Sequence, residues 1–150
     1  MEGLLAVTKV DYGTDIFLKG FNCAQSVFSA FSEDYGLDVV TARKIAGGLG
    51  GGARTAELCG AVSGAVLVIG LKHGQGASAD AAMKLKCNAE TEDFMCRFRA
   101  ANEDIVCRHL LGCDISTVSG REVALEKGLF TTKCKDLVGS AIGILIEMGY

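Results

Sequence analysis

Seven cysteines are the residues of this sequence with the most chemistry to offer. They stand at positions 23, 59, 87, 96, 107, 113 and 134 of a chain of 150 residues. A chain of this length folds without disulfide staples, and an odd number of scattered cysteines indicates metal or redox chemistry more than structural disulfides. No C-x-x-C pair is present, which excludes the thioredoxin motif and the common zinc-finger spacings.

Three of these cysteines, Cys23, Cys59 and Cys134, fall in the first turns of predicted helices. Cys107 joins them less clearly, near the start of a short predicted helix. The helix dipole and the free N–H groups at a helix start favour a thiolate and lower the pKa of the thiol. Such thiolates attack disulfides or bind soft metals. For each cysteine taken singly, the competing interpretation is a small buried hydrophobic residue.

A glycine-rich segment leads into Cys59, where residues 47–64 read GGLGGGARTAELCGAVSG. Its central residues Gly50, Gly51 and Gly52 predict a loop with positive φ or a close backbone approach to a site. The dinucleotide fingerprint needs a strand before these glycines, and the preceding segment has a helical pattern instead. A P-loop needs a lysine where Ala53-Arg54 stand. We therefore expect no nucleotide.

The elements that position these residues are predicted to be helices. Proline is absent, alternating Val/Ile/Thr runs are nearly absent, and the 20 glycines mark helix ends or helix contacts. The predicted helices cover residues 2–19, 22–35, 38–46, 55–73, 78–101, 104–111, 119–128 and 131–148, with a break expected near Asn88. Their predicted caps are Asn22 with Gln25, Asp38, Thr55, Ser119 with Glu122, and Thr131 or Thr132. We expect one all-α domain over residues 1–150, a compact bundle of six to eight helices with a glycine-rich loop.

Small residues recur every four positions on two of these helices. Gly60 and Gly64 follow Ala56 on the helix at 55–73, and Gly139 and Gly143 lie on the last helix. Small residues at this spacing let two helix backbones approach closely. We expect the helix at 55–73 to pack tightly on another helix, with the last helix as the candidate partner.

Charge and hydropathy exclude several classes of function. The net charge is −3 and there is no basic cluster, so nucleic-acid binding is not expected. The longest apolar run, 58–71, is shorter than the ~18 residues of a membrane span. No secretory signal is visible, and the cytoplasm is the expected location.

Several cysteine-containing segments belong together as a pattern. They are Phe21-Asn22-Cys23-Ala24-Gln25, the glycines at 50–52 before Cys59-Gly60-Ala61-Val62-Ser63-Gly64-Ala65, Cys107-Arg108-His109-Leu110-Leu111-Gly112, and Cys134 before Leu137-Val138. Together these segments resemble the C-GCAxxG-C-C family of redox-active proteins. The resemblance spans nearly the whole chain and implies a small helical protein with four signature cysteines, typical of anaerobes. A similar domain occurs in split-Soret cytochromes, which implies iron–sulfur binding and dimer formation.

Carried onto this sequence, the resemblance assigns the signature to Cys23, Cys59, Cys107 and Cys134. The other cysteines, Cys87, Cys96 and Cys113, lie outside it, although Cys113 is close enough in sequence to Cys107 to join the site. Four residues before Cys107, where the family pattern has glycine, this chain has Glu103. Asn102 is then the residue expected to supply a positive φ.

The leading hypothesis is a redox protein whose four signature thiolates bind a 2Fe–2S or 4Fe–4S cluster, for electron transfer or redox sensing. Amide N–H groups of Gly50, Gly51 and Gly52 would donate to the cluster sulfurs. Two alternatives use the same cysteines, a thiol–disulfide relay and a structural Cys₄ zinc site in an interaction module. Whether the protein is an enzyme stays open, and the expected partners are a redox partner protein and a second copy in a homodimer.

Overall fold

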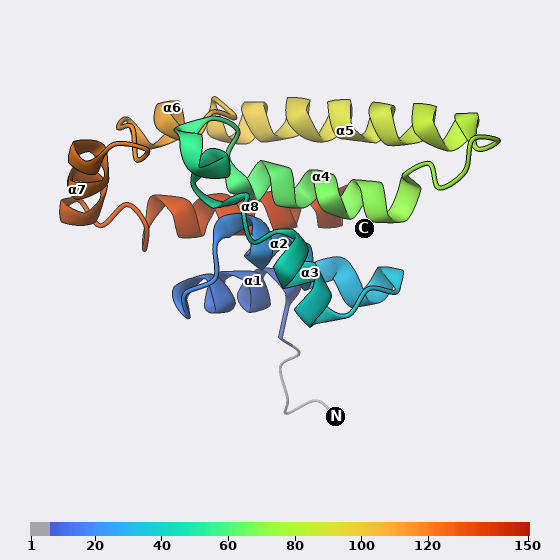
Figure 1. Cartoon of the computed structure of the whole chain (residues 1–150), viewed down its shortest axis with the longest axis horizontal. Helices are drawn as coiled ribbons and strands as arrows, with labels where there is room; N and C mark the ends of the chain where they lie inside the picture. The colour runs from blue at the N-terminus through green and yellow to red at the C-terminus, as the bar shows by residue number, and fades with distance from the viewer. Residues whose placement is uncertain (1–6) are drawn as a thin grey trace.

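The computed structural model describes residues 7–150, which fold into a bundle of α-helices (Figure 1). The α-helices are α1 (Lys9–Leu18), α2 (Cys23–Phe31), α3 (Val39–Ile45), α4 (Gly60–His73), α5 (Ala81–Asn102), α6 (Cys107–Leu111), α7 (Val118–Glu126) and α8 (Lys133–Glu147). Two short turns complete the set, η1 (Ser32–Tyr35) and η2 (Gly52–Ala56). Over residues 7–150 the only β-type pairing is an isolated bridge between Leu58 and Val106. The predicted all-α fold is confirmed.

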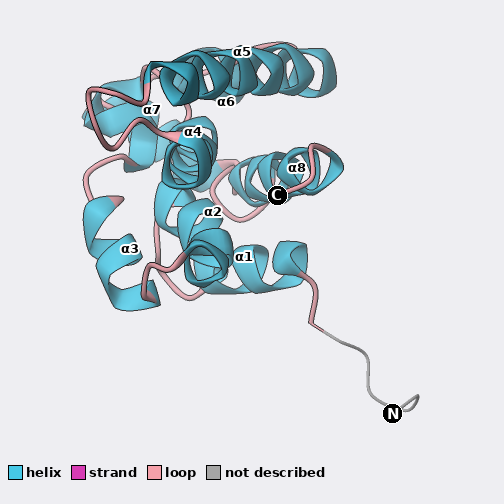
Figure 2. Cartoon of the chain, turned by 90° about the vertical axis from the view of Figure 1, so that its right-hand side faces the viewer, coloured by secondary structure: helices cyan, strands magenta, loops and turns pink. Residues whose placement is uncertain are grey.

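The helices pack in three layers. Figure 2 shows α4 and α8 in the middle, with α5 on one side and α1, α2 and α3 on the other. The core lies where these layers meet, and its fully buried side chains include Val27, Phe31, Val62, Ile69, Phe94, Phe98, Ile142 and Leu145. Because α4 is covered on both sides, its sequence is apolar or small almost all round, as expected for a central helix.

The starts of α2 and α3 follow the sequence prediction. Asn22 Oδ1 accepts a hydrogen bond from the N–H of Gln25 at 2.8 Å, and Gln25 Oε1 accepts one from the N–H of Asn22 at 2.8 Å. This reciprocal pair is the predicted capping box. Asp38 Oδ2 accepts from the N–H of Thr41 at 2.9 Å, so the second predicted cap is also confirmed.

The first helix and the long helix α5 differ from the prediction. The first helix begins at Lys9, because Thr8 is extended and its hydroxyl caps the N–H of Asp11, whereas the predicted start at residue 2 lies outside the described residues. The break near Asn88 was a wrong prediction. The exposed Asn88 side chain does not compete for the backbone hydrogen bonds of α5, which runs unbroken for 22 residues.

The predicted capping box of Ser119 and Glu122 is also wrong. Thr117 caps α7, with its Oγ1 accepting from the N–H of Gly120 at 3.0 Å. The same hydroxyl donates to the carbonyl of Asp114 at 2.8 Å, and this second bond holds it over the helix start. Ser119 therefore lies inside the first turn of α7 rather than before it.

Close helix packing through small residues is confirmed, but its partner is α2 rather than the last helix. A Cβ added at Gly64 would lie 2.7 Å from the carbonyl oxygen of Ala24, and one at Gly60 would lie 3.2 Å from Cys23 Cβ. On α8, Gly139 faces α1, and a Cβ at Gly143 would meet nothing within 4 Å. The glycines of α4 thus bring its backbone against the start of α2, which carries Cys23.

Among residues 7–150, no helix combines the length and the apolar character that crossing a bilayer requires.

Candidate functional site

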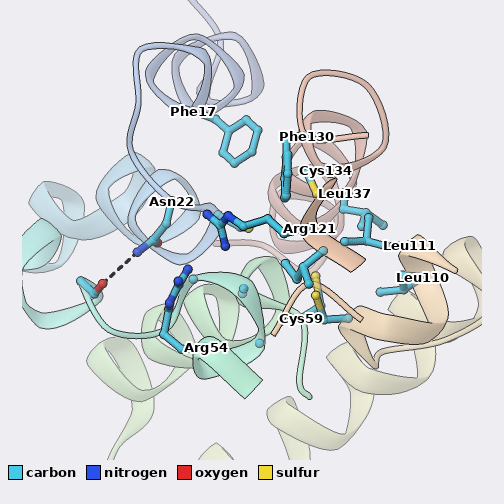
Figure 3. Close-up of a pocket in the computed structure, with 18 residues that line it drawn as sticks. Phe17, Asn22, Arg54, Cys59, Leu110, Leu111, Arg121, Phe130, Cys134 and Leu137 are labelled. Carbon is cyan, nitrogen blue, oxygen red and sulfur yellow. Dashed lines mark hydrogen bonds between the residues drawn. The ribbon is translucent and has the colours of Figure 1, made fainter. Parts of the chain in front are cut away.

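Four cysteines that are far apart in the sequence line one cavity of about 410 Å³ (Figure 3). They are Cys23, Cys59, Cys107 and Cys134. Each lies at the N-terminal end of a different helix: Cys23 and Cys107 are the first residues of α2 and α6, Cys59 is the N-cap of α4, and Cys134 is the second residue of α8. The prediction that these cysteines stand at helix starts is confirmed, and the fold brings all four helix starts together.

The backbone segment that leads to Cys59 and α4 has an unusual conformation. Five of the six residues from Gly51 to Ala56 have φ between +55° and +65°, and three of the five are not glycine: Ala53, Arg54 and Ala56. A right-handed helix cannot pass through such a run. The prediction that Thr55 caps this helix is therefore wrong, and α4 starts only at Gly60.

The glycine loop approaches its neighbours as closely as the sequence predicted. A Cβ at Gly50 would lie 2.5 Å from Asn22 Cβ, and one at Gly52 would lie 2.4 Å from the N of Glu57 and 3.1 Å from Cys107 Cβ. Gly51 and Gly52 also have the predicted positive φ. All three glycines line the cavity. Their part in binding a cofactor stays a prediction.

Backbone hydrogen bonds hold Cys59 and Cys107 side by side. The N–H of Cys59 donates to the carbonyl of Ile105 at 2.8 Å, and the N–H of Cys107 donates to the carbonyl of Glu57 at 2.5 Å. These two bonds flank the bridge between Leu58 and Val106. Segments about fifty residues apart in the chain are thereby locked in register at the cavity.

The turn before Cys107 differs from the prediction in its detail. Glu103, which stands where the family pattern has glycine, itself has φ +76°. Asn102, the residue expected to supply the positive φ, is the last residue of α5, and its amide donates to Ser140 Oγ at 2.9 Å. Asn102 is held in the helix by this contact with α8, so the reversal of the chain falls on the next residue.

Cys23 is held by the cap that precedes it. Asn22 Nδ2 donates to the carbonyls of Ala46 at 3.3 Å and Gly47 at 3.1 Å, and the second bond is drawn as the dashed line in Figure 3. Asn22 therefore caps α2 and ties it to the glycine loop at the same time. This double role accounts for an asparagine, whose amide both accepts and donates, at this position.

Burial raises the pKa of all four thiols. For Cys59 the pKa rises to about 12, through burial first and the nearby charge of Cys23 second, against hydrogen bonds from the N–H groups of Ala61 and Val62. Burial raises the pKa of Cys107 to about 11, and it also raises the pKa of Cys23 and Cys134. The predicted lowering of these pKa values is wrong for the metal-free protein, because loss of hydration outweighs the helix N–H groups.

The cysteines are near neighbours without forming a site for one ion. A thiolate at Cys23 raises the pKa of Cys59, Cys107 and Cys134, which places all four within electrostatic reach of one another. Within residues 7–150, however, no three side chains of Cys, His, Asp or Glu are close enough together to hold a single metal ion. The four cysteines therefore surround a cavity and do not converge on the position of a single ion.

The remaining cysteines lie outside the cavity wall. Cys113 is half-buried, and its charge contributes to the raised pKa of Cys107 and Cys134, but it does not line the cavity. Cys87 and Cys96 lie on α5, and Cys96 is exposed. Their exclusion from the four-cysteine set agrees with this placement.

Sequence reasoning missed two arginines and two aromatic residues of the cavity wall, Arg54, Arg121, Phe17 and Phe130. Arg54 had a local signal, since it stands two residues after the last glycine of the run. Arg121 and the two phenylalanines had none, because α1, α7 and the turn after α7 reach the cavity only through the tertiary fold.

Comparison with protein families agrees with the resemblance seen in the separate segments. The family described as "Putative redox-active protein (C_GCAxxG_C_C)" matches residues 21–148, a span that contains the glycine loop and every cysteine of the cavity. No curated protein and no solved structure showed a significant match. The chain therefore belongs to the C_GCAxxG_C_C family of redox-active proteins.

Proposed function

We propose that this protein serves electron transfer or redox sensing, with Cys23, Cys59, Cys107 and Cys134 holding an iron–sulfur cluster. One observation carries the proposal, namely that thiols from four separate segments converge on one cavity. Cysteines that served only as small hydrophobic residues would have no reason to meet there. A bound cluster would supply reversible one-electron chemistry, which suits a redox-active family.

The surroundings of the sulfurs fit such a ligand role. The backbone N–H groups of Ala61 and Val62 lower the pKa of Cys59, and the N–H of Gly51 lowers that of Cys23, so each favours the thiolate form of its neighbour. Hydrogen bonds to ligand sulfurs tune the potential of iron–sulfur clusters. A metal deprotonates a coordinating thiol outright, so the raised pKa values of the free thiols do not oppose ligation.

The spacing of the cysteines favours a cluster over a single zinc ion. A Cys₄ zinc site needs four sulfurs about 2.3 Å from one point, an arrangement that residues 7–150 do not contain. A cluster consists of several iron and sulfide atoms, so its ligand sulfurs stand farther apart, around a larger space. A cavity of about 410 Å³ provides that space.

A thiol–disulfide relay receives less support. Its attacking cysteine has to be a low-pKa, accessible thiolate. Cys59, Cys107 and Cys134 are buried, and burial raises the pKa of each. The two functions differ in what they require of the isolated protein, since only the cluster needs iron.

Anaerobic purification followed by iron, sulfide and zinc analysis and a visible absorption spectrum tests the proposal. We expect iron and sulfide in equal amounts, and a Cys59→Ser variant that loses both together with the visible absorption. The matched control is Cys96→Ser, which changes an exposed cysteine on α5 and should keep the wild-type spectrum. A colourless, iron-free anaerobic preparation would overturn the proposal. A thiol count that falls by two on mild oxidation, with no metal bound, would favour the relay instead.

A further inference from the structure

Two arginines share the cavity with the cysteines, although four thiolate ligands do not require them. Arg54 belongs to η2 and Arg121 to α7, and Figure 3 shows both side chains pointing into the cavity from opposite walls. The lining residues include no Asp, Glu or Lys. Within residues 7–150, neither guanidinium forms a salt bridge with a carboxylate.

Arg54 and Arg121 line the cavity with side chains that are exposed to solvent. The chain carries a net charge of −3, so carboxylates outnumber basic side chains and could have been placed beside either arginine. Water screens part of the repulsion between two exposed like charges, and an anion bound between them would remove the rest. The pair therefore favours a negatively charged occupant, which the cluster itself or a separate anion would provide.

Backbone conformation holds Arg54 in this position. Its φ is +65°, and those of Ala53 and Ala56 are +55°, an unfavourable conformation for residues that carry a Cβ. Residues in such conformations cluster at binding and catalytic sites. A Cβ at Gly51 would lie 3.6 Å from a terminal guanidinium nitrogen of Arg54, so the arginine folds back along the glycine loop next to the cysteines.

Aromatic contacts hold Arg121. Its guanidinium carbon lies 5.8 Å from the centroid of the Phe130 ring. A cation–π contact of this kind orients a guanidinium while leaving its N–H donors available. Phe17 and Leu137 extend the apolar wall beside it. A ligand held by the arginines would therefore have an apolar surface to contact as well.

We infer that this part of the cavity binds a small organic anion, with its oxyanion group held by Arg54 and Arg121 and its apolar part against Phe17 and Phe130. Guanidinium groups match carboxylate, phosphate and sulfonate oxygens in bidentate geometry. Because a bound cluster would take up part of the cavity of about 410 Å³, the remaining space admits only a small molecule. The inference rests on the proposed function in one respect, since the cluster and the anion would lie in the same cavity.

Titration calorimetry tests the inference with benzoate, acetate and inorganic phosphate as probes, on protein purified anaerobically and again on metal-free protein. We expect benzoate to bind more tightly than acetate, because only benzoate has an apolar body. Arg121→Gln should weaken benzoate binding about tenfold, the usual effect of losing one charged hydrogen-bonding partner. Arg54→Gln should act in the same way. The matched control is Arg99→Gln, which removes the same charge from an exposed position on α5 and should change the affinity less than twofold.

The outcomes separate this inference from the proposed function. Absence of binding for all three probes, or equal affinities in Arg121→Gln and Arg99→Gln, would show the inference to be wrong. If the arginine variants lost iron and visible absorption while keeping their affinity for benzoate, the arginines would balance the charge of the cluster instead, and the inference would again fail. Benzoate binding by a wild-type protein that never contains iron would uphold the anion site and overturn the cluster.

Discussion

Replacing Gly64 with alanine tests the close approach of α2 and α4 that places Cys23 beside Cys59. A Cβ at this position would lie 2.7 Å from the carbonyl oxygen of Ala24 and 3.0 Å from its Cα, whereas ordinary contacts begin at 3.4 Å. Both atoms belong to the backbone, so no side-chain rotation relieves the overlap. The two helices would have to separate by several tenths of an ångström.

The size of the effect follows from two opposing contributions. Overpacking a well-packed core costs about 1–3 kcal/mol, and an overlap with backbone atoms belongs near the upper end of that range. Alanine also has the higher helix propensity, which contributes about 1 kcal/mol in the opposite direction. We expect Gly64→Ala to lower the free energy of unfolding by about 2 kcal/mol. For a chain of this length, the melting temperature should fall by about 4–8 °C.

Gly70→Ala is the matched control, because it makes the same change in the same helix. A Cβ at Gly70 would meet nothing within 4 Å. Only the helix propensity then acts, and the melting temperature should rise by about 2–4 °C. Thermal and urea denaturation followed by circular dichroism measure both variants. If the two substitutions shifted stability in the same direction by similar amounts, the α2–α4 contact would not require glycine, and the reasoning would be refuted.

Two further predictions concern the turn before Cys107. Glu103→Gly should raise the melting temperature by about 2–4 °C, because glycine adopts the φ of +76° without the strain of about 1 kcal/mol that a Cβ adds. The control variant Glu103→Ala keeps the Cβ and should give no such gain. Equal shifts in the melting temperatures of the two variants would contradict the presence of backbone strain at this position. Hydrogen bonds from the N–H of Val106 and then of Ile105, with the nearby His109, hold the pKa of Asp104 below its usual range. A lowered pKa in the folded protein stabilises it above about pH 4 and ceases to do so as the pH falls further. Asp104→Asn should therefore melt below the wild type at pH 7 and together with it near pH 2, and a gap that did not depend on pH would show that the ionised carboxylate does not contribute.

Local chemistry determined much of the fold directly from the sequence. The caps at Asn22 and Asp38 are hydrogen bonds between a side chain and a backbone N–H three positions later in the sequence. Such local caps depend on no distant segment of the chain, so the sequence alone predicts them. The absence of proline and of strand patterns determined the all-α class in the same way. Cys23, Cys59 and Cys107 were also recognisable from the short segments of definite sequence beside them, and Cys134 from its spacing alone.

Contacts between distant segments decided the rest. Local propensity favours a helix start at Thr55, but hydrogen bonds of Cys59 with Ile105 and of Cys107 with Glu57 fasten the preceding segment to α6 and leave α4 to begin at Gly60. The choice of α2 as the partner of the α4 glycines has the same origin, since a small-residue stripe indicates a close contact without indicating with what.

The character of the cavity likewise belongs to the tertiary structure. A helix start by itself lowers the pKa of a cysteine, yet burial among other thiols raises it, and only the fold determines that burial. Arg121 has no sequence signal at all, because α7 is carried to the cavity by the turns on either side of it. The sequence by itself therefore determined which residues have the chemistry, and the packing of distant helices decided that they share one cavity, how strongly they are desolvated, and which charges face them.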